Sequence, residues 1–280
     1  MINDNLRELL VRRVGFANSD IPKLVDLIHH PKKTTQIGSV LTHMSSEHVG
    51  LGMYGYFVEG NIQTFKQNFY IASKLRAASA NKHWGETLSM DGSFLYPLLS
   101  DSAEIINTYS RLEPEEYLKN RDNPRVPQFF VHMIQLVLRD EHEALRVKID
   151  KGARGSGKPY REEFKAGQDF YSLLLQRDRQ ALEARILKEA QFWETIIKKG
   201  KMTGNPLTED FLATNAVMYA KLCWIKGIEV QVDSPFVPMD LLPVAPLSHY
   251  DDSYDFLKSS WVIPPRGLMG KITRWLAPTK

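Results

Sequence analysis

Residues 181–199, with the sequence ALEARILKEAQFWETIIKK, carry the clearest structural signal in this chain of 280 residues. Apolar side chains recur there at spacings of 4, 4, 3 and 4, at Leu182, Ile186, Ala190, Trp193 and Ile197. This spacing places them on one face of an α-helix. Two lysines and then Gly200 complete the stretch, as suits a helix C-terminus. The stretch therefore predicts a helix with one buried face.

The same helical spacing recurs along the chain. It is found at residues 62–75 and again at residues 126–137. Residues 211–225 are apolar on nearly all sides, which predicts a central, buried helix. These spacings together predict an all-α fold.

Polar residues that suit helix caps follow an apolar pair at four places, at Asn61, Asp101, Asp140 and Asp178. They lie 40, 39 and 38 positions apart, in the size range of helical repeats. Glutamates three residues after Asp101 and Asp140 have the spacing of a capping box. The pattern predicts stacked antiparallel helical hairpins. Two arrangements remain open, a solenoid-like stack and an irregular bundle with evenly spaced loops.

The character of the chain changes after Gly227. Ile228, Val230 and Val232 alternate with polar residues, which indicates a short extended segment. Four prolines between residues 235 and 246 then prevent a helix. We expect a single domain over residues 1–280, with a helical body at 1–232 and a Pro-rich tail at 233–280 that wraps over the helices. A last short helix is predicted at 267–276.

Composition limits the function. The net charge is +3, from 36 Lys+Arg and 33 Asp+Glu, so the sequence does not argue for nucleic-acid binding. With 43% hydrophobic residues the composition is that of a globular protein. One cysteine, Cys223, excludes an intrachain disulfide and a Cys-based zinc site. The chain shows neither an N-terminal signal peptide nor an apolar run of 18 residues, which predicts a cytoplasmic protein that does not enter the membrane.

The sequence does not single out an active site. Residues 152–158, GARGSGK, resemble a phosphate-binding loop, but Pro159 stands where that motif needs Ser or Thr. The eight histidines are scattered, without a metal-binding spacing. We therefore expect no enzyme, no catalytic residues, no cofactor and no metal. A less favoured alternative is a helical enzyme with a site assembled from dispersed residues such as His132, Glu143 and Tyr171.

The tail holds the candidate partner-binding residues, which are Tyr250, Asp251, Asp252, Tyr254 and Asp255. Tyrosines beside carboxylates suit recognition of a basic partner. The alternative is a tail docked by its aromatic side chains, with its acids in water. A second acidic stretch, residues 113–122, makes a weaker case.

Residues 213–242 resemble the C-terminal signature of the immunity protein 49 family, in which a helix that ends in Gly leads into the pattern I-E-V-x-V-x-S-P-x-x-P-x-x-L-L. The positions that fit are Ile228, Glu229, Val230, Val232, Ser234, Pro235, Pro238, Leu241 and Leu242. Residues 98–101 and 122–124 are also similar to segments of relatives in this group.

The resemblance implies an all-α protein of a bacterial polymorphic toxin system. Such proteins bind a cognate toxin, a nuclease or a deaminase among others, so that it cannot kill the cell that makes it. The toxins pass between bacteria by contact-dependent routes, among which we expect type VI secretion. Neutralisation by steric occlusion is the favoured mechanism. The alternative is a helical-repeat scaffold for protein–protein interaction.

Overall fold

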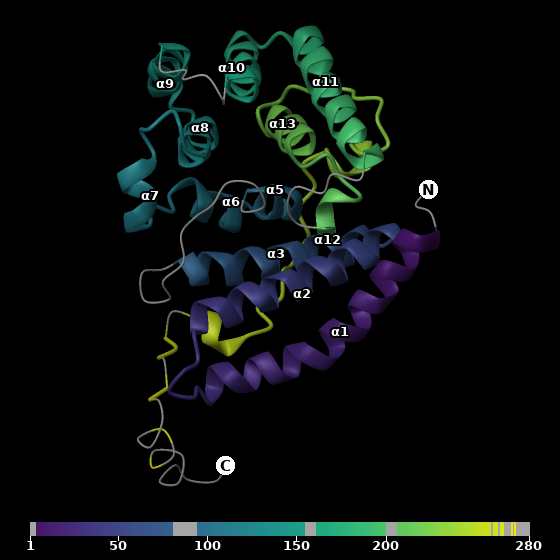
Figure 1. The fold of residues 1–280 in the computed structure, drawn as a ribbon, viewed down its shortest axis with the longest axis vertical. Coiled ribbons are helices and arrows are strands. Elements are labelled where there is room, and N and C mark those ends of the chain that lie inside the picture. Colours follow the sequence, from purple (N-terminus) through teal and green to yellow (C-terminus); the bar gives the residue numbers. More distant parts are fainter. Residues whose placement is uncertain are drawn as a thin grey trace. The chain divides into compact units, whose positions relative to one another are not determined.

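The computed structural model describes residues 4–80, 94–154, 161–199, 206–258, 260–262, 264–265, 270 and 272. Within these residues the chain forms helices and no strand, so the predicted all-α class is confirmed (Figure 1). Contacts divide the chain into two compact units, one of Met1–Glu86 with His249–Lys280 and one of Thr87–Ser248.

The first unit contains three long helices, α1 (Asp4–His29), α2 (Ile37–Phe57) and α3 (Ile62–Ala80), of which α2 packs on both neighbours. Gly52 and Gly55 allow α2 and α3 to approach closely. A Cβ atom at Gly52 would lie 2.9 Å from the ring of Phe69, and one at Gly55 would lie 2.6 Å from Cγ2 of Thr64. The tail adds the 3₁₀ turn η2 (Asp255–Leu257), which contacts α3.

The second unit is built from helices of 4 to 20 residues, many of them packed in sequential pairs. They are α5 (Leu95–Ser100), α6 (Ala103–Ser110), α7 (Glu115–Asn120), α8 (Gln128–Leu138), α9 (His142–Arg154), α10 (Arg161–Gln176), α11 (Arg179–Lys198), α12 (Pro206–Glu209), α13 (Thr214–Ile225) and the 3₁₀ turn η1 (Met239–Leu241). Consecutive helices from α8 to α11 pack on each other, and α13 packs on α11 and α5. The predicted packed helical pairs are therefore present.

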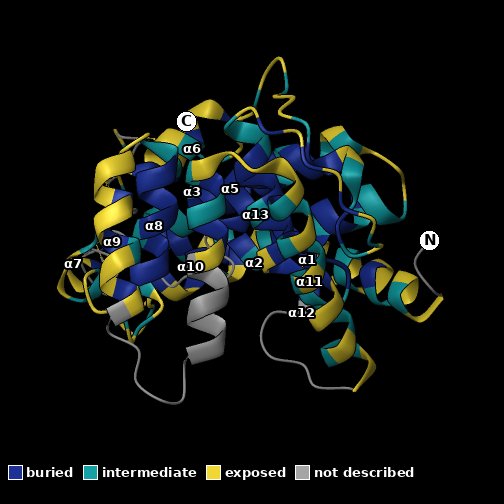
Figure 2. Ribbon diagram, turned by 90° about the horizontal axis from the view of Figure 1, so that it is seen from above, coloured by how far each residue is buried: buried dark blue, intermediate teal, exposed yellow. Residues whose placement is uncertain are grey.

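Burial follows the apolar pattern in most elements. In Figure 2 the ribbons of α5 and α8 are dark blue, and the outer side of α9 is yellow. The apolar side chains of α13 from Ala216 to Met218 and from Leu222 to Cys223 are buried, which confirms the predicted central helix. In α11 the predicted apolar face is buried at Leu182, Ile186 and Ala190, whereas Trp193 and Ile197 are only half-buried.

The four predicted caps divide into two kinds. Asn61 and Asp178 accept the backbone N–H of Thr64 and Ala181, both at 3.0 Å, as N-caps do. Asp101 and Asp140 instead adopt left-handed backbone conformations, each with φ of 59°. They close the preceding helix, so their prediction as N-caps was wrong. Asp suits both positions, because its short polar side chain also tolerates the left-handed region.

A buried lysine holds the described part of the Pro-rich segment within the second unit. Nζ of Lys221 donates to the carbonyl oxygens of Leu241, Leu242 and Pro243, each at 3.0 Å. It also lies 2.6 Å from Oδ1 of Asp101. Both leucines are buried. The predicted helix at 267–276 falls almost wholly outside the described residues.

Candidate partner-binding surfaces

The five predicted partner-binding residues lie against the helices of the first unit, mainly α2 and α3, with Asp255 beside His29 of α1. The ring of Tyr250 faces that of Tyr70, with 4.8 Å between centroids. The hydroxyl of Tyr254 lies 2.7 Å from Nε2 of His48, whose Nδ1 lies 2.8 Å from Oδ1 of Asn68. The two tyrosines therefore serve as anchors of the tail.

The carboxylates of the same segment differ in their partners. Asp252 accepts the Tyr70 hydroxyl at 3.0 Å and pairs with Lys74 at 2.5 Å. Burial alone would raise the pKa of Asp252, but the hydrogen bonds from Lys74 and Tyr70 outweigh it and lower that pKa. Asp255 lies 3.2 Å from Nε2 of His29, and Asp251 lies 3.1 Å from that of His249. All three aspartates remain exposed.

Gln67 binds the backbone of the tail rather than its side chains. Its amide donates to the carbonyl of Asp251 at 2.9 Å and accepts the N–H of the same residue at 3.1 Å. This paired contact fixes the direction in which the tail crosses α3. Together with the contacts of Tyr250 and Tyr254, it holds this part of the tail on the helices of the first unit.

The second acidic stretch is largely neutralised by its neighbours. Glu113 pairs with Arg121 at 2.6 Å, and Lys119 lies within 4 Å of Glu115 and Glu116. Asp122 pairs with Lys148 at 3.0 Å. The stretch offers little uncompensated negative charge to a basic partner.

The residues of the dispersed-enzyme alternative are engaged separately. Nδ1 of His132 lies 2.7 Å from Nζ of Lys148, and burial lowers the pKa of His132 to about 4. Glu143 forms an ion pair with Arg146 and is exposed. Tyr171 is fully buried beside Phe170, and burial raises its pKa. The structure gives each of the three its own set of neighbours.

Cys223 is enclosed in α13. Its side chain is buried, and burial raises the pKa of its thiol to about 12. A thiol with so high a pKa is a poor nucleophile. The residue acts as a small apolar side chain of the core.

Three residues of the first unit could hold a metal ion. The ligand atoms of Asp20, His43 and Glu47 all lie within 4.8 Å of one another. Two internal contacts already account for them, since Asp20 pairs with Lys23 at 2.9 Å and His43 bonds Glu47 at 3.1 Å. The ammonium of Lys23 would repel a cation at this place.

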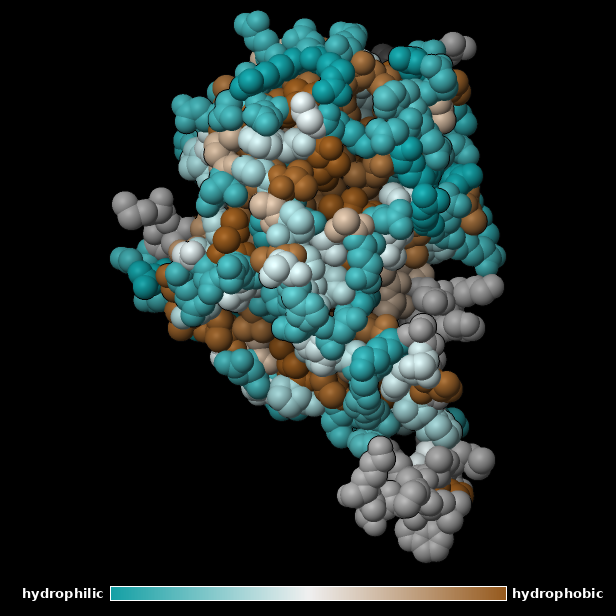
Figure 3. All heavy atoms as spheres, turned by 180° about the vertical axis from the view of Figure 1, so that it is seen from behind, coloured by the Kyte–Doolittle hydropathy of each residue, from teal (hydrophilic) through white to brown (hydrophobic). Residues whose placement is uncertain are grey.

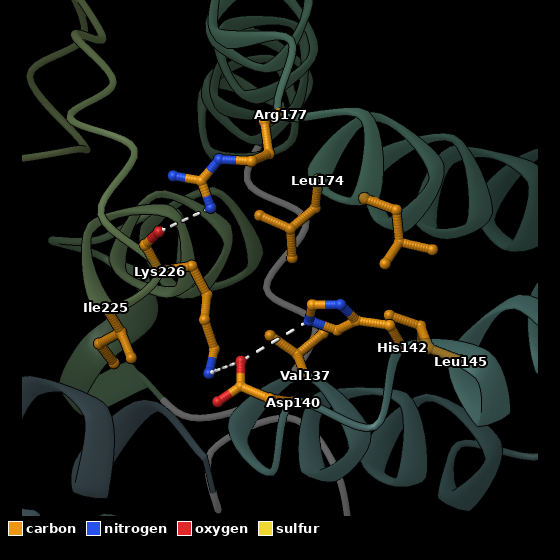
Figure 4. Close-up of a pocket in the computed structure, with 9 residues that line it drawn as sticks. Val137, Asp140, His142, Leu145, Leu174, Arg177, Ile225 and Lys226 are labelled. Atoms are coloured by element: carbon orange, nitrogen blue, oxygen red, sulfur yellow. Dashed lines mark hydrogen bonds and ion pairs between the residues drawn. The ribbon is translucent and has the colours of Figure 1, made fainter.

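The second unit has a pocket of about 330 Å³ where three chain turns meet. They are the turn between α8 and α9, the turn between α10 and α11, and the end of α13 (Figure 4). Aliphatic side chains line it, namely Val137, Leu145, Leu174, Leu175 and Ile225. Its shape is set by helix ends that are themselves packed in the core.

Four charged or titratable residues complete the lining of this pocket. Nζ of Lys226 pairs with Asp140 at 2.7 Å, and Nε2 of His142 lies 3.6 Å from the same carboxylate. The hydrogen bond from Lys226, the largest cause, helps lower the pKa of Asp140. Arg177, with φ of 57°, donates to the carbonyl oxygens of Lys226 at 3.1 Å and Gly227 at 3.4 Å. Sequence analysis missed this group because its members lie far apart in the chain.

Apolar side chains also reach the surface elsewhere. Figure 3 shows hydrophobic atoms between hydrophilic ones on one face of the molecule. The most exposed large apolar side chains among the described residues are Val11, Phe16, Leu118, Val147, Phe192, Val244, Val262 and Ile272. Such scattered exposure is ordinary for a globular protein and does not mark a docking surface by itself.

The pocket and most of the signature that follows α13 lie in a stretch of the chain that matches a known protein family. The family model described as Immunity protein 49 matches residues 112–241, a little under half of the chain. Over these residues the chain is similar to the immunity protein 49 family. This confirms the resemblance over residues 213–241, whereas Leu242 and residues 98–101 lie outside the match. Comparisons with curated proteins and with solved structures each gave no significant match.

The family match also bears on the expected absence of enzymatic activity and on the position of the binding surface. Immunity protein 49 is a family of immunity proteins and not of enzymes, as we expected for this chain. Its matched stretch contains the whole pocket lining and ends before the acidic tail residues 250–255. Among the described residues, we find no helix with the length and apolarity needed to cross a bilayer.

Proposed function

We propose that this chain is the immunity protein of a bacterial toxin system, which binds one cognate toxin in the cytoplasm of the producing cell and occludes it sterically. The family match over residues 112–241 is the observation that carries this proposal. The match includes α8, α11 and α13, which form much of the core of the second unit.

A preformed helical surface suits this task. A stable interface buries about 800 Å² on each partner. The accessible surface of this chain is 14916 Å², so such an interface needs roughly one twentieth of it. Packed helix ends present a rigid surface, and a rigid surface loses little conformational entropy when it binds.

Co-expression tests the proposal. The candidate toxin is the C-terminal domain of a large secreted protein encoded beside this chain, and it is induced in a sensitive bacterium with or without this chain. We expect survival and a co-purifying complex only when this chain is present. Toxicity without rescue, by a chain shown to be folded, would reject that toxin as the partner.

Occlusion has its own test. A purified complex should lose activity in proportion to the amount of this chain added, with nuclease and deaminase assays as the first two to run. A complex that forms but retains full toxin activity would contradict occlusion. It would favour the helical-repeat scaffold instead, for which the packed helical pairs are the supporting observation.

A further inference from the structure

The pocket at the end of α13 has an unusual arginine at its rim. Arg177 holds a left-handed backbone conformation, with φ of 57°. This conformation is unfavourable for a residue other than Gly. Asp101 and Asp140 occupy the equivalent turns, and each has a lysine of α13 or its end as a partner. Arg177 has no carboxylate partner among the described residues, and its side chain is exposed.

The guanidinium of Arg177 is nevertheless fixed in place. Its two bonds to the carbonyl oxygens of Lys226 and Gly227 use two of about five N–H donors. The remaining donors are available to a planar, bidentate acceptor, and a carboxylate fits that geometry best. Asp140, the only carboxylate among the described residues that line the pocket, already pairs with Lys226 and lies near His142.

The interior of the pocket suits an apolar group. Its volume of about 330 Å³ lies at the lower end of the roughly 300–1,000 Å³ typical of ligand pockets. Val137, Leu145 and Leu174 are buried, while Leu175 and Ile225 are half-buried at its wall. An apolar interior with a charged rim is the arrangement in which one inserted side chain contributes much of the binding energy of an interface.

We propose that this pocket receives an apolar side chain of the toxin, and that a toxin carboxylate beside it pairs with Arg177. The inference rests on the proposed function and names the surface that performs it. All nine lining residues fall within residues 137–226, inside the matched family stretch. The acidic tail falls outside that stretch, and its aromatic side chains are already used to hold it on α2 and α3.

Binding of the neighbouring toxin domain to the full chain tests this, by calorimetry at low and at high salt. Arg177→Gln removes the charge and the guanidinium donors and leaves a shorter, neutral polar side chain. We expect it to weaken binding about tenfold or more and to reduce the salt dependence of the affinity. Leu175→Ala, which removes part of the wall, should weaken binding about fivefold or more.

The first unit supplies matched controls. Arg12→Gln and Val11→Ala make comparable changes at exposed positions of α1 and should change the affinity less than twofold. Thermal unfolding of every variant shows that each is folded. Since Arg177 and Leu175 are not fully buried, both variants should remain so.

The possible failures are distinguishable. If the wild-type chain binds the toxin and both pocket variants bind as the controls do, this inference is overturned and the proposed function stands. Loss of binding only in Asp251→Asn, Asp252→Asn or Asp255→Asn would place the interface on the tail and overturn it as well. A folded wild-type chain that neither binds nor rescues would overturn the proposed function for that toxin, and the inference with it.

Discussion

Two lysines near the end of the same helix pair with aspartates that stand at equivalent turns. Lys221 meets Asp101, and both side chains are 0% exposed. Lys226 meets Asp140, with side chains 17% and 66% exposed. The chemistry and the left-handed turns are alike, but water reaches only the second pair. A buried pair that loses one partner leaves an uncompensated charge, whereas an exposed pair contributes little. The Lys221–Asp101 bridge therefore stabilises the fold. The Lys226–Asp140 bridge contributes little to stability and forms part of the surface.

The largest effect is expected when the buried lysine is substituted. Lys221→Met should lower the free energy of unfolding by about 3–5 kcal/mol, because it leaves the Asp101 carboxylate unpaired in the core. The carbonyl oxygens of residues 241–243 also lose their donor. Urea unfolding followed by circular dichroism measures the change.

The same substitution in the exposed bridge is the matched control. Lys226→Met should cost about 1 kcal/mol or less. The double variant Lys221→Met with Asp101→Asn should recover part of the loss, since the buried charge is then removed. Equal losses in the two single lysine variants would mean that burial does not separate the bridges.

A third lysine, Lys148, lies between these extremes, and the histidine beside it makes stability depend on pH. Lys148 is 5% exposed and faces Asp122, which is 63% exposed, and its Nζ lies 2.7 Å from Nδ1 of His132. Burial, aided by Lys148, lowers the pKa of His132 to about 4. The unfolded chain, with a His pKa of about 6.5, binds this proton more readily. Stability should therefore fall by up to about 3 kcal/mol as the pH drops from about 6.5 to 4.

His132→Gln checks that assignment. Its free energy of unfolding should change less than that of the wild type over the same pH interval. Both proteins share their carboxylates, so the difference between the two curves isolates the histidine. Parallel curves would show that His132 does not carry the effect.

The contribution of the exposed Lys226–Asp140 bridge to stability should depend on the salt concentration. Asp140→Asn removes a carboxylate that pairs with Lys226, and we expect a loss of about 0–1 kcal/mol that shrinks at high ionic strength. Unfolding curves at 0.05 M and 1 M NaCl make the comparison. A loss of several kcal/mol at both salt concentrations would show that this pair behaves like the buried one.

The smallest effect is expected from Gly at the exposed turn. Asp140→Gly relieves a left-handed conformation, a gain of about 1 kcal/mol, and loses an exposed ion pair of similar or smaller size. The net change should lie within about 1 kcal/mol of zero. Asp101→Gly also relieves a left-handed conformation, but it removes the carboxylate that pairs with the buried Lys221. It should therefore destabilise the chain clearly. Calorimetric melting of both variants decides whether the turns differ only in burial.

Much of the fold could be predicted from local signals. The spacing of apolar residues located the helix at 179–198 and the buried helix at 214–225. The turn positions near 61, 101, 140 and 178 were found as well, because caps and turns depend on residues within about four positions. The local signal was ambiguous at Asp101 and Asp140, since the same residue type can begin a helix or close one.

Local sequence signals located the candidate sites less well than the helices. The sequence drew attention to Tyr250–Asp255 because aromatic and acidic residues are adjacent there. It could not show that Tyr254 meets His48, which lies 206 residues away. For the pocket, the turn signals at Asp140 and Asp178 were visible, but the convergence of these turns on the end of α13 was not.

The all-α class, several of the helices, four of the turns and the resemblance to an immunity family could be read from the sequence alone, because these depend on short-range spacing and on a contiguous signature. Three features required the folded structure: which turns face α13, which of two similar lysine–aspartate bridges is buried from water, and where an arginine lies at the rim of an apolar pocket. Lys226 and Asp140 are 86 residues apart. The burial that separates a structural pair from a surface pair exists only when distant segments have packed together.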